Sequence, residues 1–228
     1  MRVLIIAPTN FQSYATAVLV KLLKNPDIEV VGVLVHAFNI SRLKIEFKRD
    51  GIRLFRKVLN KAILNEKHSL DYSFDSPKRY LVQSGIKPNL KALCDLNNIY
   101  HKKVSSFSNA NLIDDLTNLK IDIGAFCGGG LLRNKFLDSF SFGVLNCHMG
   151  VLPNYRGMDV VEWPFLENAK HQVGVTCHLM DKGIDTGDIL DIVKVDADKF
   201  QNFIEIRSFV LNIICYNVYV LIPFYYSP

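Results

Sequence analysis

The chain has 228 residues, a formal net charge of +5 and five cysteines. This length accommodates one substantial α/β domain with a small appendage, and it excludes two full domains. The cysteines are odd in number, widely spaced and form no Cys-x-x-Cys pair, which excludes a disulfide framework or a zinc ribbon. The first apolar run ends at Pro8, too early for a signal peptide. We therefore expect a cytoplasmic protein with reduced, mostly buried thiols.

Apolar strand-like runs alternate with helix-like stretches along the whole chain. We expect strands over residues 2–8, 29–37, 99–104, 121–127, 143–148 and 173–180. We expect helices over residues 14–23, 89–98, 109–120 and 200–220. The stretch 66–88 is polar and mixed and receives no assignment. This alternation predicts an α/β fold, a doubly wound and mostly parallel sheet, with residues 1–200 as its main domain.

Residues 42–64 carry much of the positive charge, with apolar residues at near-helical spacing between Lys and Arg. One interpretation is a basic face for a phosphate-bearing substrate, RNA or an anionic membrane surface. The other is an amphipathic surface helix whose charged face is simply solvated. We favour the second interpretation, because most charged helix faces are solvated.

The last residues, 208–228, contain no charged side chain. A transmembrane helix needs about 20 predominantly apolar residues, and here Asn212, Asn217 and Pro223 interrupt the run. We expect residues 201–228 to form a core-packing helix followed by an apolar tail, which packs on the body or on a second subunit as a homodimer. A membrane anchor is the less favoured alternative, so we expect no membrane span.

Two polar residues stand at the end of an apolar strand in the segment GVLNCH. Residues i and i+2 of a strand point to the same side, so Asn146 and His148 project together. In α/β sheets ligands bind at the carboxyl ends of the strands. Further along, Asp185 lies between Gly183 and Gly187 in an acidic turn that can wrap closely around a ligand.

An amide, an imidazole and a carboxylate together suit acyl transfer without a covalent enzyme intermediate. Asn146 and protonated His148 could donate hydrogen bonds to the oxygen that becomes negative when an amine attacks a carbonyl carbon. Asp185 could hold the cationic His148 and relay a proton. The alternatives are a satisfied strand-end histidine, a turn-capping asparagine and an ordinary turn aspartate. The chain offers no G-x-S-x-G motif and no plausible cluster of metal ligands.

The segment 143–190 resembles the folate-dependent formyltransferases, the family that includes glycinamide ribonucleotide transformylase, methionyl-tRNA formyltransferase and the sugar-nucleotide N-formyltransferases. The family pattern runs Asn-x-His, Leu-Pro-x-x-x-Gly, Gly-Val-Thr-x-His and Asp-x-Gly. In this chain it is formed by Asn146, His148, Leu152, Pro153, Gly157, Gly174, Val175, Thr176, His178, Asp185 and Gly187.

The resemblance implies that Asn146, His148 and Asp185 are the catalytic residues and that 10-formyltetrahydrofolate is the formyl donor. It also implies that the pterin ring is enclosed through backbone contacts by two loops, whose residues are Gly129, Gly130, Leu132, Met180 and Ile184. The triplet 128–130 departs from the bulkier residues usual there. Glycines still let backbone amides approach a flat ring closely.

The acceptor that the resemblance favours is an amino sugar linked to a nucleotide, made for surface polysaccharides. Tyr155, Arg156 and Trp163 are the candidate acceptor-binding residues, with Arg156 suited to a phosphate and Trp163 to stacking or core packing. The loop 7–17 lacks the glycine-rich phosphate cradle of the ribonucleotide enzymes, and the chain has no room for an RNA-binding barrel, so we expect no nucleic-acid partner. Glycinamide ribonucleotide, methionyl-tRNA, and an inactive folate- or nucleotide-binding protein remain alternatives.

Overall fold

A single twisted sheet organises the computed structural model, which describes residues 1–37, 76–157, 160–201 and 203–225. Within these residues seven strands follow the order β3-β2-β1-β4-β5-β6-β7. Neighbours from β3 to β5 run parallel, whereas β6 and β7 are antiparallel to the strands beside them. The strands are β1 (Arg2–Ala7), β2 (Glu29–His36), β3 (Tyr100–Val104), β4 (Ile123–Phe126), β5 (Gly143–His148), β6 (Gly174–Leu179) and β7 (Ile189–Lys194). The expected α/β class with a mostly parallel sheet is confirmed.

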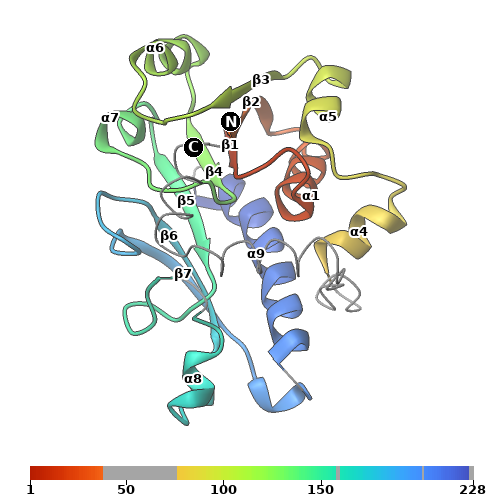
Figure 1. Ribbon diagram of the computed structural model, residues 1–228, viewed down its shortest axis with the longest axis vertical. Coiled ribbons are helices and arrows are strands. Elements are labelled where there is room, and N and C mark those ends of the chain that lie inside the picture. The colour runs from red at the N-terminus through yellow and green to blue at the C-terminus, as the bar shows by residue number, and fades with distance from the viewer. Residues whose placement is uncertain (38–75, 158–159, 202, 226–228) are drawn as a thin grey trace, which may run out of the picture.

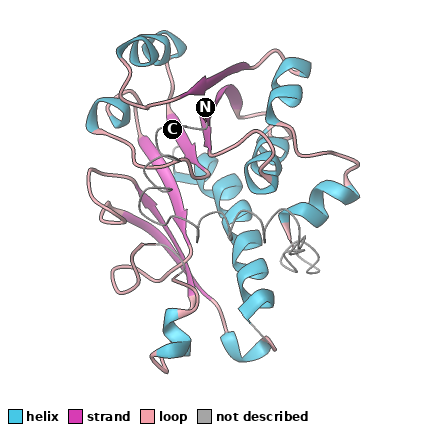
Figure 2. Cartoon of the chain, in the orientation of Figure 1, coloured by secondary structure: helices cyan, strands magenta, loops and turns pink. Residues whose placement is uncertain are grey.

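Helices cover both faces of the sheet (Figure 1, Figure 2). They are α1 (Ser13–Leu22), α4 (Pro77–Gln83), α5 (Leu90–Leu96), α6 (Ala110–Leu119), α7 (Asn134–Leu137), α8 (Trp163–Leu166) and α9 (Phe203–Tyr225), with short 3-10 turns at Lys170–Gln172 and Ala197–Lys199. Polar side chains start several of them. Asn89 accepts a hydrogen bond from the Ala92 amide at the start of α5, and Ser76 accepts one from the Arg79 amide at the start of α4. Such caps satisfy amides that have no partner within the helix.

The two faces of the sheet bury separate apolar clusters. In the central strand β1, Val3 and Ile5 belong to the cluster under α1, α4, α5 and α9, whereas Leu4 and Ile6 belong to the cluster under α6 and α7. All four side chains have no exposed surface. Alternate residues of a strand point to opposite faces, so a continuous apolar run is what a strand covered on both sides requires.

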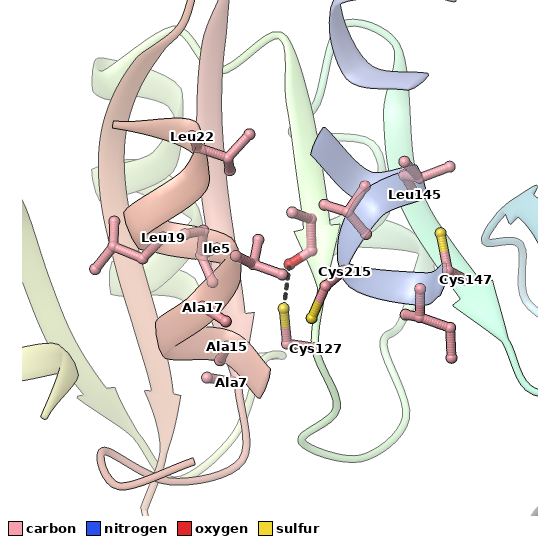
Figure 3. Packing of buried hydrophobic residues seen from close by; sticks show 14 of the residues in the cluster. Ile5, Ala7, Ala15, Ala17, Leu19, Leu22, Cys127, Leu145, Cys147 and Cys215 are labelled. Carbon is pink, nitrogen blue, oxygen red and sulfur yellow. Dashed lines mark hydrogen bonds between the residues drawn. The ribbon is translucent and has the colours of Figure 1, made fainter. Parts of the chain in front are cut away.

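The C-terminal helix α9 is part of the first cluster. It contacts α1, β5 and β6, and Figure 3 shows Cys215 of this helix in the same packing as Leu19 and Leu145. The expected end near residue 220 is wrong, because the helix continues to Tyr225. Leu221 and Ile222 are buried, and that burial favours continuing the helix into Pro223.

One helix in the described part of the chain, α9, is long and apolar enough to cross a membrane by length and composition. Half of its window Glu205–Ile222 is buried against the rest of the protein. Packing on α1 and the sheet therefore accounts for much of its apolar character. The expected absence of a membrane span stays a prediction.

Most expected elements are present with ends shifted by one to three residues. The unassigned stretch 66–88 contains α4, which the sequence analysis did not predict. The basic segment 42–64 lies outside the described residues, so its expected helix stays a prediction.

The packing of α9 in the core can be tested by substituting two neighbouring isoleucines of the helix, one buried and one partly buried. Ile214 is 2% exposed, whereas Ile213 is only partly buried. We expect Ile214→Ala to lower the free energy of unfolding by about 2–5 kcal/mol, since a buried Ile→Ala change removes apolar burial and leaves a cavity. Ile213→Ala is the matched control and should cost less than half as much in urea denaturation. Equal losses at both positions would contradict the packing of α9 described here.

Candidate functional site

Three consecutive glycines follow β4 where the chain leaves the sheet. Gly128, Gly129 and Gly130 have φ values of 101°, 129° and 106°, in the region that L side chains rarely adopt. A Cβ at Gly129 would lie 3.5 Å from the carbonyl oxygen of Ala7, at the end of β1. The glycines therefore permit a backbone path along the carboxyl ends of the two central parallel strands, where α/β sheets bind ligands.

The end of β5 carries the Asn-x-His pair. Asn146 and His148 project to the same side, and Cys147 between them joins the core cluster on the opposite face. His148 is 8% exposed, whereas Asn146 is half-buried. The antiparallel strand β6 places His178 opposite Asn146 and Thr176 opposite His148. Four polar side chains from two strands thus share one face of the sheet.

The His148 ring is fixed by the loop that follows β5. Its Nε2 lies 2.7 Å from the carbonyl oxygen of Tyr155, and because a carbonyl only accepts, Nε2 carries the proton. The other ring nitrogen, Nδ1, faces Asp185, whose Oδ2 lies 3.6 Å away. A Cβ at Gly150 would lie 2.7 Å from the Tyr155 oxygen and 2.9 Å from His148 Nε2, so only glycine leaves room for this contact.

Thr176 fastens the same loop to β6. Its hydroxyl donates to the carbonyl of Gly150 at 2.7 Å and accepts from the amide of Leu152 at 3.0 Å. The peptide bond between Leu152 and Pro153 is cis. A buried threonine that uses both its donor and its acceptor holds the backbone in one position.

Asp185 completes the group from the loop between β6 and β7. Its backbone has φ 51°, and its Oδ2 accepts a hydrogen bond from the Gly157 amide at 2.9 Å. Oδ2 lies 3.6 Å from His148 Nδ1, and Oδ1 lies 3.6 Å from His178 Nε2. These separations allow electrostatic attraction but exceed ordinary hydrogen-bond lengths. One carboxylate thus stands between two histidines.

The pKa of the Asp185 carboxyl lies below its usual range. Burial alone would raise this pKa, but His178, the Gly157 amide and His148 together outweigh burial and lower it. The carboxylate is therefore the form that this site stabilises. Among the described residues, no three His, Cys, Asp or Glu side chains are grouped to hold a metal ion.

The expected donor-binding residues belong to two loops, one after β4 and one after β6, and they differ in exposure. Ile184 is 59% exposed and Met180 is partly buried, whereas the Leu132 side chain is 5% exposed and belongs to the second core cluster. Leu132 can therefore meet a ligand only through its backbone. Its neighbour Leu131, which the sequence analysis did not single out, is 66% exposed and offers an apolar side chain.

The expected acceptor-binding residues differ in what they offer. The Tyr155 hydroxyl donates to Glu167 Oε2 at 2.8 Å, and its ring is buried, so this residue fixes the loop with its side chain. Arg156 is exposed and stands between the residues whose backbones hold His148 and Asp185. Trp163 is half exposed at the start of α8.

Two residues of the cluster, Thr176 and His178, were not predicted as site residues, although both belong to the motif. Their roles depend on the antiparallel register of β5 and β6, which pairs Asn146 with His178. Residues 146 and 178 are far apart in sequence, so strand spacing alone could not join them. The motif Gly-Val-Thr-x-His was the available signal.

A family model described as formyl transferase matches residues 72–206, which is more than half of the chain. The chain belongs to the formyl transferase family. The match spans β5, β6 and the Asp185 loop, the elements that form the cluster.

Among curated proteins the chain is similar to methionyl-tRNA formyltransferases. It is 30% identical over 140 residues to that of Clostridioides difficile (strain 630), covering 61% of this chain and 45% of that protein. It is 35% identical over 88 residues to that of Finegoldia magna, covering 39% of this chain and 27% of that protein. The chain thus spans less than half the length of these relatives.

Solved structures share the fold. The phosphoribosylglycinamide formyltransferase of Campylobacter jejuni superposes with a TM-score of 0.61 at 13% identity, over 100% of this chain and 98% of that one. A sugar N-formyltransferase from Shewanella gives 0.57 at 15% identity, over 96% of this chain and 67% of that one. At these identities the likeness extends to the fold alone.

The lowered pKa of Asp185 predicts an acid dependence of stability. The carboxylate stabilises the folded state fully above the ordinary Asp pKa of about 3.9, and this contribution is lost as pH falls through the lower folded-state pKa. We expect Asp185→Asn to be less stable than the wild type at pH 7, with the gap narrowing as pH drops below about 4. Urea midpoints across pH measure this, with Asp138→Asn, an exposed aspartate, as control. A gap that widens on acidification would refute it.

Proposed function

We propose that this protein is an N-formyltransferase that moves a formyl group from 10-formyltetrahydrofolate to the primary amine of a small acceptor. The observation that carries the proposal is the convergence of Asn146, His148 and Asp185 at the carboxyl end of β5. Membership of the formyl transferase family supports the reaction type. A protein that only bound folate would have no chemical need for an amide, an imidazole and a buried carboxylate in one place.

The three side chains have distinct tasks in this reaction. Asn146 donates an N–H to the formyl oxygen as negative charge develops there, and His148 does so in its protonated form. Asp185 lies 3.6 Å from His148 Nδ1 and favours the imidazolium when a proton resides there. Asp185 then accepts, directly or through water, the proton that the acceptor nitrogen must lose, and the proton passes to the folate nitrogen as its bond to the formyl carbon breaks. No nucleophilic serine or cysteine takes part.

The donor fits the loops that flank this centre. The path of residues 128–130 exposes backbone groups along the ends of β1 and β4, which suits a flat heterocycle such as a pterin. The exposed Leu131 and Ile184 side chains supply apolar surface for such a ring. Gly129, Gly130, Leu132 and Met180 contribute through the backbone or the loop walls. The donor supplies an activated formyl group, and the chain supplies its position and a proton path.

For the acceptor we propose a nucleotide-linked amino sugar, used in the cytoplasm for surface polysaccharides. Arg156 supports this, because its exposed guanidinium stands one residue from each backbone group that holds His148 and Asp185. A diphosphate beside the reacting amine would meet this guanidinium in charge-assisted hydrogen bonds. Trp163, half exposed, offers a surface on which a sugar or base can stack. The Shewanella sugar N-formyltransferase has the same fold.

Methionyl-tRNA is the second candidate acceptor. The sequence relatives that match this chain at 30–35% identity are methionyl-tRNA formyltransferases. The described residues contain no second domain beyond the sheet and its helices.

A mass-spectrometric assay with 10-formyltetrahydrofolate distinguishes these acceptors. The panel is a set of nucleotide-linked 3-amino and 4-amino sugars, glycinamide ribonucleotide and methionyl-tRNA. We expect one sugar nucleotide to gain a single formyl mass only when the folate is present. Formylation of methionyl-tRNA alone would replace the proposed acceptor, and formylation of none would refute the proposed activity. In the active pair, His148→Ala should lower kcat by about 100- to 10,000-fold.

Substitution of Arg156 tests the proposed contact between its guanidinium and the diphosphate of the sugar nucleotide. We expect Arg156→Ala to raise the KM for the sugar nucleotide by about 10- to 100-fold, as the loss of a charged hydrogen bond worth about 1.5–3 kcal/mol requires. The KM for the folate should stay within about threefold, which is the change left by a contact worth under about 1 kcal/mol. Lys103→Ala, which removes an exposed cation from the edge strand β3, is the control and should change neither constant. An unchanged acceptor KM in Arg156→Ala would show that Arg156 does not hold the phosphate.

A further inference from the structure

The amide of Asn146 has a partner that dictates which way it points. Its Nδ2 lies 3.1 Å from His178 Nε2, and His178 Nδ1 lies 2.9 Å from the carbonyl oxygen of Leu179. A carbonyl only accepts, so Nδ1 of His178 carries a proton and donates it. In the neutral ring Nε2 is then a lone pair, and a lone pair accepts from the N–H of an amide.

We propose that His178 is a positioning residue: through its unprotonated Nε2 it holds the Asn146 amide with Nδ2, the donor end, turned to the reacting centre. This inference rests on the proposed formyl transfer and deepens it. An asparagine amide has a donor end and an acceptor end of similar shape. Only the donor end stabilises a negative oxygen. Without a hydrogen-bond partner the Asn146 amide would also populate the flipped orientation, in which Oδ1 faces the reacting centre.

The surroundings of His178 make the assignment specific. Its ring is 1% exposed, so water cannot supply an alternative partner, whereas Asn146 is half-buried and keeps a second N–H for the ligand. The charged and titratable groups around the ring are Asp185, whose Oδ1 is 3.6 Å from Nε2, His148, whose ring centre is 6.5 Å away, and Asp181. A carboxylate only accepts, so Asp185 could form a hydrogen bond with Nε2 only if that nitrogen were protonated. If Nε2 gained a proton it would turn to this carboxylate and cease to accept from Asn146.

A second histidine–asparagine pair, between β3 and the turn after β1, has the opposite polarity and serves as a control. His101 Nε2 lies 2.8 Å from Asn10 Oδ1, so there the ring is the donor and the amide oxygen the acceptor. His101 stands on β3, far along the sheet from β5 and β6. The loss of this bond removes a comparable contact and touches no group of the catalytic cluster.

The first test is spectroscopic and needs no activity. In 15N-labelled wild-type protein at neutral pH, we expect the nitrogen spectrum of His178 to show a protonated Nδ1 and an unprotonated Nε2. We also expect a scalar coupling across the hydrogen bond from Asn146 Nδ2 to His178 Nε2. The His178 signals are assigned by their loss in His178→Gln. A protonated Nε2, or an uncoupled Asn146 side chain, would overturn the inference whatever the protein catalyses.

The second test separates positioning from mere stability. His178→Leu keeps a buried apolar volume but offers no acceptor, so kcat for formyl transfer should fall by about 100-fold or more, as when an oxyanion donor is lost. The KM for 10-formyltetrahydrofolate should change little. His178→Gln, whose carbonyl can accept from Asn146, should recover part of kcat, and His101→Leu should leave kcat unchanged.

Each kinetic outcome bears on the inference. A folded His178→Leu variant with near wild-type kcat would overturn it, and so would equal losses in His178→Leu and His101→Leu. If wild-type protein formylates no acceptor, the proposed function fails, while the spectrum still decides how His178 holds Asn146.

Discussion

The antiparallel pairing of β5 with β6 is the constraint on which the site depends. Up to β5 the sheet is parallel, and a further parallel strand would have required a crossover back to the amino ends of the strands before pairing again. Instead, after α8 and the 3-10 turn Lys170–Gln172, β6 runs antiparallel beside β5 and places His178 opposite Asn146 and Thr176 opposite His148. Residues that lie far apart in the sequence thereby become immediate neighbours, and the turn that follows β6 delivers Asp185 to the same place.

The same pairing sorts the side chains of the two strands. Cys147 and Cys177 face the apolar cluster beneath α9, while the residues beside them in sequence face the site. Burial raises the pKa of Cys147 well above its usual value and that of Cys127 to about 12. Thiols of this kind behave as small apolar side chains and not as nucleophiles. All five cysteines are free and buried, as the sequence analysis expected.

The sequence predicted those parts of the structure that depend on local pattern. Apolar runs marked the strands because both faces of the sheet are covered, and the Asn-x-His spacing placed two side chains on one face by strand geometry alone. It did not predict the end of α9, because Leu221 and Ile222 are buried by contacts with distant elements and a proline ordinarily signals an end. It also did not predict the role of His178, which exists only in the register between strands.

The cluster formed by Asn146, His148, His178 and Asp185 combines an unusual backbone conformation with a partly buried charge. Asp185 adopts a left-handed conformation that is unusual for a residue other than glycine, and its side chain is 13% exposed. Its carboxylate accepts a hydrogen bond from the Gly157 amide and lies 3.6 Å from one nitrogen of each of two imidazoles. Burial alone would raise the pKa of this carboxyl, and its neighbours His178, the Gly157 amide and His148 outweigh burial and lower it. The histidines are in turn oriented by backbone carbonyls, of Tyr155 for His148 and of Leu179 for His178. Because the Leu179 carbonyl fixes which nitrogen of His178 carries a proton, the direction of the hydrogen bond between His178 and Asn146 is set before any ligand arrives, and such preorganisation stabilises developing charge at low cost.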